Sequence, residues 1–288
     1  MRHNIKLVCA VIAVLAAVIL TGIILYARPR SIEAKAAIID PLSSTQLKEN
    51  VSRHQNLTFI REAKNLLMKR FSTVDYYSDN ATIEQYRRLP TLGYKFIVWR
   101  THTALDEGGF VAISSSEKYD SRKYAEYAVG QITLCNITHD PNLYFAITPR
   151  FIKEIMTGGL KDSVVVLMSC NGLNQYYYGT AEALVEKGAK AIISWTGWID
   201  PSDNDNSISL FLDRLINENS TISEAVDRAP TFTYPYGSSV LQYYPANSQV
   251  ADYHIPDYRQ DNISTDIAFI SATAVTGKIR WRISTWLV

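Results

Sequence analysis

The sequence predicts an α/β domain built on a mainly parallel sheet with helices on both faces. Three short apolar runs rich in β-branched or aromatic residues are typical of buried strands, namely Tyr94–Arg100, Val164–Met168 and Ala191–Trp195. Helix start and stop signals separate these runs, so strands and helices alternate along the chain. Because a strand–helix–strand unit makes its two strands parallel, this alternation predicts a parallel sheet between two helical layers.

Local signals predict the remaining elements of this domain. Residues 74–77 and 110–114 are short β-prone runs. Thr148 can cap a helix whose first residue is Pro149, and Gly188 can end another helix. Helices bounded by such caps, glycines or prolines are expected at residues 82–89, 149–156, 180–187, about 203–216 and 223–229.

The segments on either side of the domain have a different character. Residues 28–72 are mixed and polar, with room for one or two helices within 46–70, and we expect a membrane-proximal stalk there. Residues 73–230 hold the α/β domain. Residues 231–288 are β-rich, with a hairpin expected at Thr276-Gly277. This tail is either an extension on the edge of the sheet or a small separate β unit.

The N-terminal segment, residues 1–27, contains the longest apolar run. Residues 7–27 carry no charge, and as a helix they would span roughly 31 Å, enough to cross a bilayer. The run is longer than the apolar region of most signal peptides, which favours an uncleaved membrane anchor over a cleaved signal peptide. Arg2 and Lys6 precede the run, whereas Arg28, Arg30 and Lys35 follow it, so charge leaves the orientation open.

Glycosylation sequons bear on the compartment of the domain. Six Asn-x-Ser/Thr sequons occur, beginning at Asn50, Asn56, Asn80, Asn136, Asn219 and Asn262. They favour a glycosylated domain on the extracytoplasmic side of a single-pass membrane protein. The alternative is a surface that is simply rich in Asn, Ser and Thr.

Composition and motifs exclude several classes of function. A net charge of +1 gives no bulk attraction for nucleic acid, and three cysteines are too few for a disulfide scaffold. The chain has no paired CxxC, HExxH, Walker or GxGxxG motif, so we expect no metal and no cofactor. A disulfide between Cys135 and Cys170 remains an alternative to two free thiols. His54 and His254 have no partner pattern, and His139 is expected in a loop, with a position at the border of the cleft as the alternative.

Two reactive side chains follow predicted strands. His102 lies two residues beyond Tyr94–Arg100, and Cys170 lies two residues beyond Val164–Met168. Parallel strands end at the same edge of a sheet, and neighbouring strands lie about 4.8 Å apart, so the two side chains can meet. A thiol beside an imidazole is a nucleophile beside a base. A buried, inert cysteine and a structural histidine are the alternative for each residue taken alone.

The two segments FIVWRTH and VVVLMSC, which end at His102 and Cys170, resemble those of the caspase-like (clan CD) cysteine peptidases. The likeness is closest to gingipain, clostripain and CHAT-type domains, and it covers roughly residues 74–230. The stretch GTAEALVEKGAKAIISWTGWIDPSDNDNSISLFLDRLINENSTISEAVDRA is similar to the helix–strand–helix block that follows the cysteine in those domains. The resemblance implies a three-layer caspase-like (caspase-hemoglobinase) fold and an endopeptidase that acts on peptides or proteins without a cofactor.

The resemblance also implies residue roles. Cys170 would be the nucleophile, His102 the general acid and base, and the backbone N–H groups of Thr103 and Cys170 the oxyanion hole. The family usually has glycine where this chain has Thr103. The loop after the next strand would bind substrate, with Trp195 stacking on a side chain and Asp200 or Asp203 pairing with Arg or Lys. The alternative is ordinary loop and cap chemistry, with Asp203 as a helix N-cap and Asp200-Pro201 as the start of a turn.

Two further classes of function stay open at this point. Thr103 in place of glycine is compatible with a catalytically silent caspase-like module that binds or senses a partner at the cell surface. A Cys–His acyl hydrolase that acts on a substrate other than a peptide is the other alternative. The sequence predicts no oligomeric state.

Overall fold

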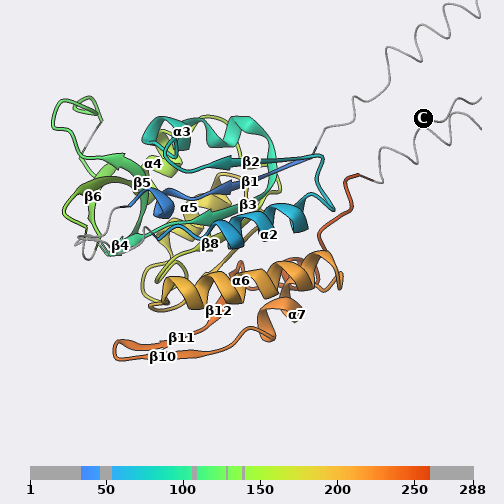
Figure 1. Ribbon diagram of the computed structural model, residues 1–288. Helices are drawn as coiled ribbons and strands as arrows, with labels where there is room; N and C mark the ends of the chain where they lie inside the picture. Colours follow the sequence, from blue (N-terminus) through green and yellow to red (C-terminus); the bar gives the residue numbers. More distant parts are fainter. Residues whose placement is uncertain (1–33, 46–53, 106–108, 128, 138–139, 260–288) are drawn as a thin grey trace, which may run out of the picture. The chain divides into compact units, whose positions relative to one another are not determined.

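The computed structural model describes residues 34–45, 54–105, 109–127, 129–137 and 140–259, and a six-stranded sheet forms its centre (Figure 1). The strand order is β12-β9-β8-β3-β1-β2. All neighbouring pairs are parallel except β12 and β9, which are antiparallel. The strands are β1 (Lys35–Ile39), β2 (Thr73–Tyr77), β3 (Tyr94–Arg100), β8 (Val164–Met168), β9 (Ala191–Trp195) and β12 (Leu241–Tyr244). The predicted α/β class with a mainly parallel sheet is therefore confirmed.

The three strands that the apolar runs predicted, β3, β8 and β9, have the predicted bounds residue for residue. Every residue of β8 and β9 is buried. A strand covered on both faces needs apolar side chains at every position rather than at alternate ones. This requirement explains why continuous runs such as VVVLM identified these strands so clearly.

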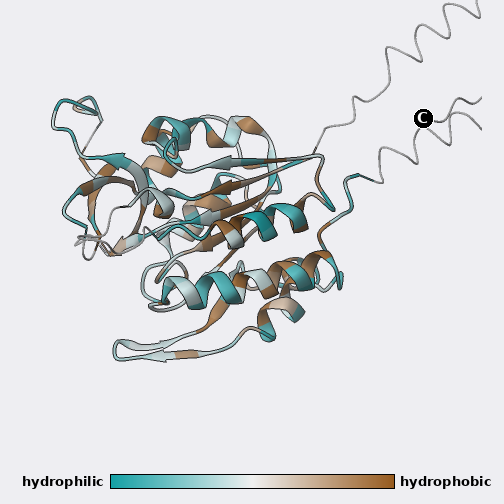
Figure 2. Ribbon diagram, viewed as in Figure 1, coloured by the Kyte–Doolittle hydropathy of each residue, from teal (hydrophilic) through white to brown (hydrophobic). Residues whose placement is uncertain are grey.

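Helices cover both faces of the sheet. Side chains of β1, β3 and β8 such as Ile38, Val98 and Val166 share one core with helices α2 (Leu57–Leu67), α6 (Pro201–Ile216) and α7 (Ile222–Asp227). The alternate residues share a second core with α3 (Ile83–Arg88), α4 (Pro149–Glu154) and α5 (Gly179–Glu186). Figure 2 shows the apolar strands between helices whose outer surfaces are hydrophilic. The predicted helical layers on both faces are confirmed.

Capping residues set the helix starts. Thr148 accepts a hydrogen bond from Phe151 N and Pro149 is the first residue of α4, as predicted. The start predicted for α6 at Asp203 or Asn204 is wrong, because the helix begins at Pro201. Asp200 caps it by accepting a hydrogen bond from Ser202 N at 2.8 Å. Proline at the first helical position lacks only an N–H that the helix does not use, which allows the earlier start.

The strand β1 lies inside the segment for which we predicted a stalk. It pairs with β3 on one side and β2 on the other, and the compact unit that contains it begins at Ala34. A short 3-10 helix, Pro41–Ser44, and α2 follow it. The described residues before Thr73 are therefore part of the sheet and of one helical layer. The sequence KAAII contains only two β-branched residues, which is too weak a pattern to predict a strand.

The described part of the tail extends the same sheet. β12 occupies its edge beside β9, so the edge-extension alternative is confirmed for these residues. β10 (Phe232–Tyr234) and β11 (Gly237–Ser239) form a separate antiparallel pair, and α8 (Ser248–Ala251) follows β12. The hairpin predicted at Thr276-Gly277 lies outside the described residues.

A second, antiparallel sheet begins directly after His102. Its order is β4-β5-β7-β6, and only part of β5 was predicted. The strands of this second sheet are β4 (Thr103–Leu105), β5 (Val111–Lys118), β6 (Ile132–Asn136) and β7 (Leu143–Ile147). Elsewhere in the chain, a short 3-10 helix, Leu89–Leu92, precedes β3 of the first sheet.

The predicted anchor, residues 7–27, lies outside the described residues. Among those that the structure describes, no helix is both long and apolar enough to cross a membrane. Three sequon residues, Asn80, Asn136 and Asn219, are exposed. Asn56 has a structural use, since its side chain caps α2 and donates a hydrogen bond to Asp205. Glycosylation and the extracytoplasmic location stay predictions.

Candidate active site

His102 and Cys170 follow two neighbouring strands in matching register. β3 and β8 pair in parallel with Arg100 opposite Met168, and Thr101 N donates a hydrogen bond to Met168 O at 3.2 Å. His102 and Cys170 each lie two residues beyond this pair. The two strands are thus adjacent, and both residues leave the sheet at its carboxyl edge, where parallel sheets place their reactive groups.

Thr103 joins the two segments. Its hydroxyl donates a hydrogen bond to the carbonyl oxygen of Cys170. This side-chain contact crosses from the residue after the histidine to the cysteine itself, so the two chain segments lie within hydrogen-bond distance. Glycine at this position could not make the bond. The oxyanion-hole role of the Thr103 and Cys170 N–H groups stays a prediction.

The thiol of Cys170 is half-buried against the backbone of Ile199. Ile199 N donates to Sγ at 3.4 Å, and Sγ lies 3.5 Å from Ile199 O. Burial raises the pKa of the Cys170 thiol, and the hydrogen bond from Ile199 N opposes that rise. Cys170 and Cys135 are both free, so the disulfide alternative is wrong. Cys135 is buried on β6, and burial raises its pKa to about 11.

The chain after Cys170 is held against the chain after β9. Asn171 N donates to Gly197 O at 2.8 Å, and Leu173 N donates to Trp195 O at 3.0 Å. Gly172 lies between them, where an added Cβ would come within 2.2 Å of Ser194 Oγ. Only glycine fits this close approach, which fixes the turn that carries Cys170.

The imidazole of His102 has one ring nitrogen without a hydrogen bond to the described residues. Its Nε2 atom is buried and has no hydrogen-bond partner among the described residues. The ring packs edge-on against His54, with ring centroids 5.5 Å apart. Burial, the neighbouring His54 and the charge of Arg100 lower the pKa of His102 to about 3. His102 is therefore neutral at physiological pH, the form in which it can accept a proton.

A buried ion cluster lies close to His102 along the chain, and the sequence did not predict it. Arg100 donates two hydrogen bonds to Asp205, at 2.7 and 2.9 Å, and one to Asp40 at 2.9 Å. The side chains of all three are at most 5 % exposed. Arg100 lies two residues before His102. The cluster therefore ties the end of β3 to the residue after β1 and to α6.

The residues predicted to bind substrate have other contacts. Trp195 is fully buried, and its Nε1 donates to Asn204 Oδ1 at 2.9 Å. Asp200 caps α6, and Asp203 accepts a hydrogen bond from the Tyr234 hydroxyl at 2.6 Å. The N-cap predicted at Asp203 is therefore wrong, because Asp203 lies in the first turn of α6 and Asp200 is the cap. Substrate contact by these three residues stays a prediction.

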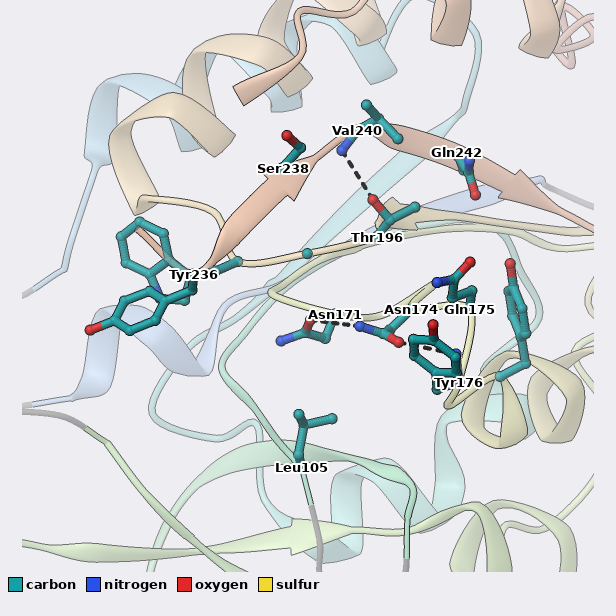
Figure 3. A pocket seen from close by; sticks show the side chains of 13 residues that line it. Leu105, Asn171, Asn174, Gln175, Tyr176, Thr196, Tyr236, Ser238, Val240 and Gln242 are labelled. Carbon is teal, nitrogen blue, oxygen red and sulfur yellow. Dashed lines mark hydrogen bonds between the residues drawn. The ribbon is translucent and has the colours of Figure 1, made fainter. Parts of the chain in front are cut away.

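A cavity of about 800 Å³ is lined by residues from the segments that follow His102 and Cys170 (Figure 3). Its lining includes Leu105 at the end of β4, residues of the segment after Cys170 and Thr196–Trp198 after β9. Gln242 of β12 and the exposed Tyr236 of the β10–β11 turn complete one side. This volume is within the range of ligand pockets. The lining residues come from loops and strand ends that are far apart in the chain, and no sequence signal predicted that they lie together.

Among the described residues, no group of three or more His, Cys, Asp or Glu side chains is arranged to hold a metal ion. His254 bonds to Asn219 O through Nδ1, and His139 lies outside the described residues. A comparison of the chain with models of known protein families finds no match, and neither does a comparison with curated proteins.

Proposed function

We propose that the protein is a caspase-like cysteine endopeptidase that uses Cys170 as nucleophile and His102 as general base and acid. The observation that carries the proposal is the matching register of these two residues beyond adjacent parallel strands. The thiol is free, and the buried Nε2 of His102 has no partner among the described residues. A free thiol and an unpartnered neutral imidazole at one sheet edge are the parts that covalent acyl transfer needs.

The chemistry follows in two stages. Sγ attacks the scissile carbonyl while its proton passes to His102, giving a tetrahedral intermediate. The intermediate collapses as His102 returns the proton to the leaving amine, and an acyl-enzyme thioester remains. Water then loses a proton to His102 and attacks the thioester, which releases the carboxylic acid and restores the thiol.

The cellular setting is part of the same proposal. Residues 7–27 would anchor the chain in a membrane, and the catalytic domain would lie on the extracytoplasmic side. The exposed sequons Asn80, Asn136 and Asn219 support that side. The substrates would be peptides or proteins that reach the extracytoplasmic face of that membrane.

A second candidate is a catalytically silent module with the same fold. The observation that favours it is the hydrogen bond of the Thr103 hydroxyl to Cys170 O, which adds a side chain where the related peptidases have glycine. In this candidate the cavity would bind a partner without cleaving it.

A peptide-library experiment decides between the two candidates. The reduced, folded full chain is incubated with a mixed peptide library, and new termini are identified by mass spectrometry. The peptidase proposal expects cleavage that stops when Cys170 is alkylated. A folded, reduced protein that cleaves no peptide contradicts the peptidase and supports the silent module.

The pH dependence of thiol alkylation tests the charge state of the dyad. A raised pKa of Cys170 and a lowered pKa of His102 make the resting pair a neutral thiol and a neutral imidazole. The thiolate fraction then grows as pH approaches the raised pKa, so the rate of alkylation by iodoacetamide should rise steadily from about pH 6 to about pH 9. A rate that stays level from about pH 6 to about pH 8 indicates a thiolate–imidazolium pair and contradicts the neutral dyad.

A further inference from the structure

The cavity is lined by chain neighbours of the candidate site residues, whereas Cys170 and His102 are not themselves part of its lining. Asn171, which lines the cavity, directly follows Cys170. Trp198 also lines it and precedes Ile199, whose N–H donates to Sγ. Leu105, another lining residue, lies three residues beyond His102. A substrate bound at Cys170 would therefore extend one of its side chains into this cavity.

The described lining of the cavity carries no Asp, Glu, Lys or Arg. The acidic residues expected to select Arg or Lys are otherwise engaged, Asp200 by Ser202 and Asp203 by the Tyr234 hydroxyl, and neither is part of the lining. A charged substrate side chain that entered the cavity would lose hydration without gaining an opposite charge there, and such burial is unfavourable.

The polar groups that line the cavity are all uncharged, and they comprise carboxamides, hydroxyls and the Trp198 indole (Figure 3). Asn174 is oriented by two bonds: its Nδ2 donates to Asn171 Oδ1 at 3.1 Å, and its Oδ1 accepts from Tyr176 N at 3.0 Å. Gln175 and Gln242, from different segments of the wall, have no hydrogen bonds to the described residues through their side chains. Each presents one acceptor and one NH₂ donor to a ligand.

The rim of the cavity is aromatic. Tyr236 is 84 % exposed, Tyr176 is 75 % exposed, and the Trp198 ring lies 6.3 Å from the Tyr236 ring. Such rings cover the apolar stem of a long side chain while leaving its polar end free to bond. A neutral side chain with an apolar stem and a terminal donor and acceptor matches both features.

We propose that this cavity binds an uncharged, hydrogen-bonding substrate side chain of glutamine size, adjacent to the bond that Cys170 attacks. This assignment rests on the proposed peptidase function and specifies which substrate side chain the peptidase prefers. A terminal carboxamide can exchange N–H···O pairs with Gln175 or Gln242. Glutamate would lose the donor and add an unpaired charge, lysine would add an unpaired charge, and methionine would offer no hydrogen bond to the exposed Gln175 and Gln242.

Cleavage-site profiling tests the inference with the full chain. Every cleaved bond in a peptide library of known composition is read by mass spectrometry. Glutamine should be enriched at one of the two positions that flank the cut, by at least about tenfold over Glu, Lys and Met. In the Gln242→Glu variant, lysine should gain about tenfold relative to glutamine at that position. The matched control is Gln249→Glu, an exposed glutamine of α8 outside the cavity, which should leave the profile unchanged.

A binding measurement supplies a readout that needs no cleavage. The Cys170→Ala protein is titrated calorimetrically with blocked Ala-X-Ala peptides in which X is Gln, Glu, Lys or Met. The glutamine peptide should bind at least about tenfold more tightly than the others. Cleavage that depends on Cys170 but favours a charged residue, or is equal for all four, overturns the inference and leaves the peptidase intact. Absence of all cleavage contradicts the peptidase, and equal binding of the four peptides then overturns the cavity assignment as well.

Discussion

Replacing Cys170 with alanine is expected to lower kcat/KM for peptide cleavage by at least about 10³-fold. The sulfur supplies the bond that forms in the acyl-enzyme, and alanine has no atom that can form it. Alanine is smaller than cysteine, so the change removes the weak contacts of Sγ with Ile199 N and O and a small part of the packing against the core. The fold should therefore persist, and the loss should appear in kcat rather than in stability.

Cys135→Ala is the matched control for this experiment. Cys135 is also free and is more buried, but it lies on β6 of the antiparallel sheet rather than after β8. Its replacement should change kcat/KM little while costing about 1 kcal/mol in stability. If Cys170→Ala were as active as wild type and Cys135→Ala were inactive, Cys135 would be the reactive thiol and the proposed dyad would be contradicted.

His102→Gln should lower kcat/KM by a similar factor, and the double variant with Cys170→Ala should be no worse than the single one. When two residues act as one catalytic unit, removing either one already abolishes their joint contribution to kcat/KM, so removing the second costs nothing more. Two independent losses that multiply would indicate that His102 acts apart from the thiol. The comparison requires only the ratio of kcat/KM values in the four proteins.

Local sequence signals predicted the part of the site that depends on single strands. The apolar runs that end at Arg100 and Met168 identified β3 and β8, and the positions of His102 and Cys170 follow from those ends. The cap at Thr148 and the strand Ala191–Trp195 were equally local. Such features are encoded within a few neighbouring residues, so no knowledge of the packing is needed to find them.

The rest of the site depends on residues far apart in the chain. His54 lies 48 positions before His102, yet the two rings pack edge-on. Asp40 lies 60 positions before its partner Arg100, in a segment without a recognisable strand pattern. Tyr236 reaches the cavity from the turn between β10 and β11, and Gln242 reaches it because β12 pairs with β9. Periodicity and capping rules describe neighbours along the chain, so they could not reveal these contacts.

The Arg100 cluster leads to the second large expected effect. Arg100→Met should lower the free energy of unfolding by about 3–5 kcal/mol, because it leaves the Asp40 and Asp205 carboxylates buried without their cation. Hydrogen bonds from Ser43 N, the Ser43 hydroxyl and the Tyr76 hydroxyl to Asp40 would remain, but these neutral donors cannot replace the positive charge. Urea unfolding followed by circular dichroism measures the change.

Two matched variants show how much of the stability loss in Arg100→Met comes from the burial of the ion cluster and how much from the lost positive charge. Arg87→Met removes an arginine from an exposed ion pair with Glu84 and should cost far less than Arg100→Met, because water screens that pair. Arg100→Lys keeps the positive charge but loses the two-pronged bond to Asp205, so its cost should be intermediate. If Arg100→Met costs no more than Arg87→Met, the cluster does not stabilise the fold. If Arg100→Met does not fold, the Lys variant still gives a measurable difference.

The position of the cluster links this stability effect to the candidate site. Asp205 receives hydrogen bonds from Arg100 and from Asn56, so it connects the end of β3 with the start of α2. His102 follows Arg100 by two residues and His54 precedes Asn56 by two, and their rings are in contact. Arg100→Lys should therefore lower kcat as well as stability, because a less rigid cluster allows His102 to move relative to Cys170. Unchanged kcat in a destabilised Arg100→Lys protein would restrict the cluster to a purely structural role.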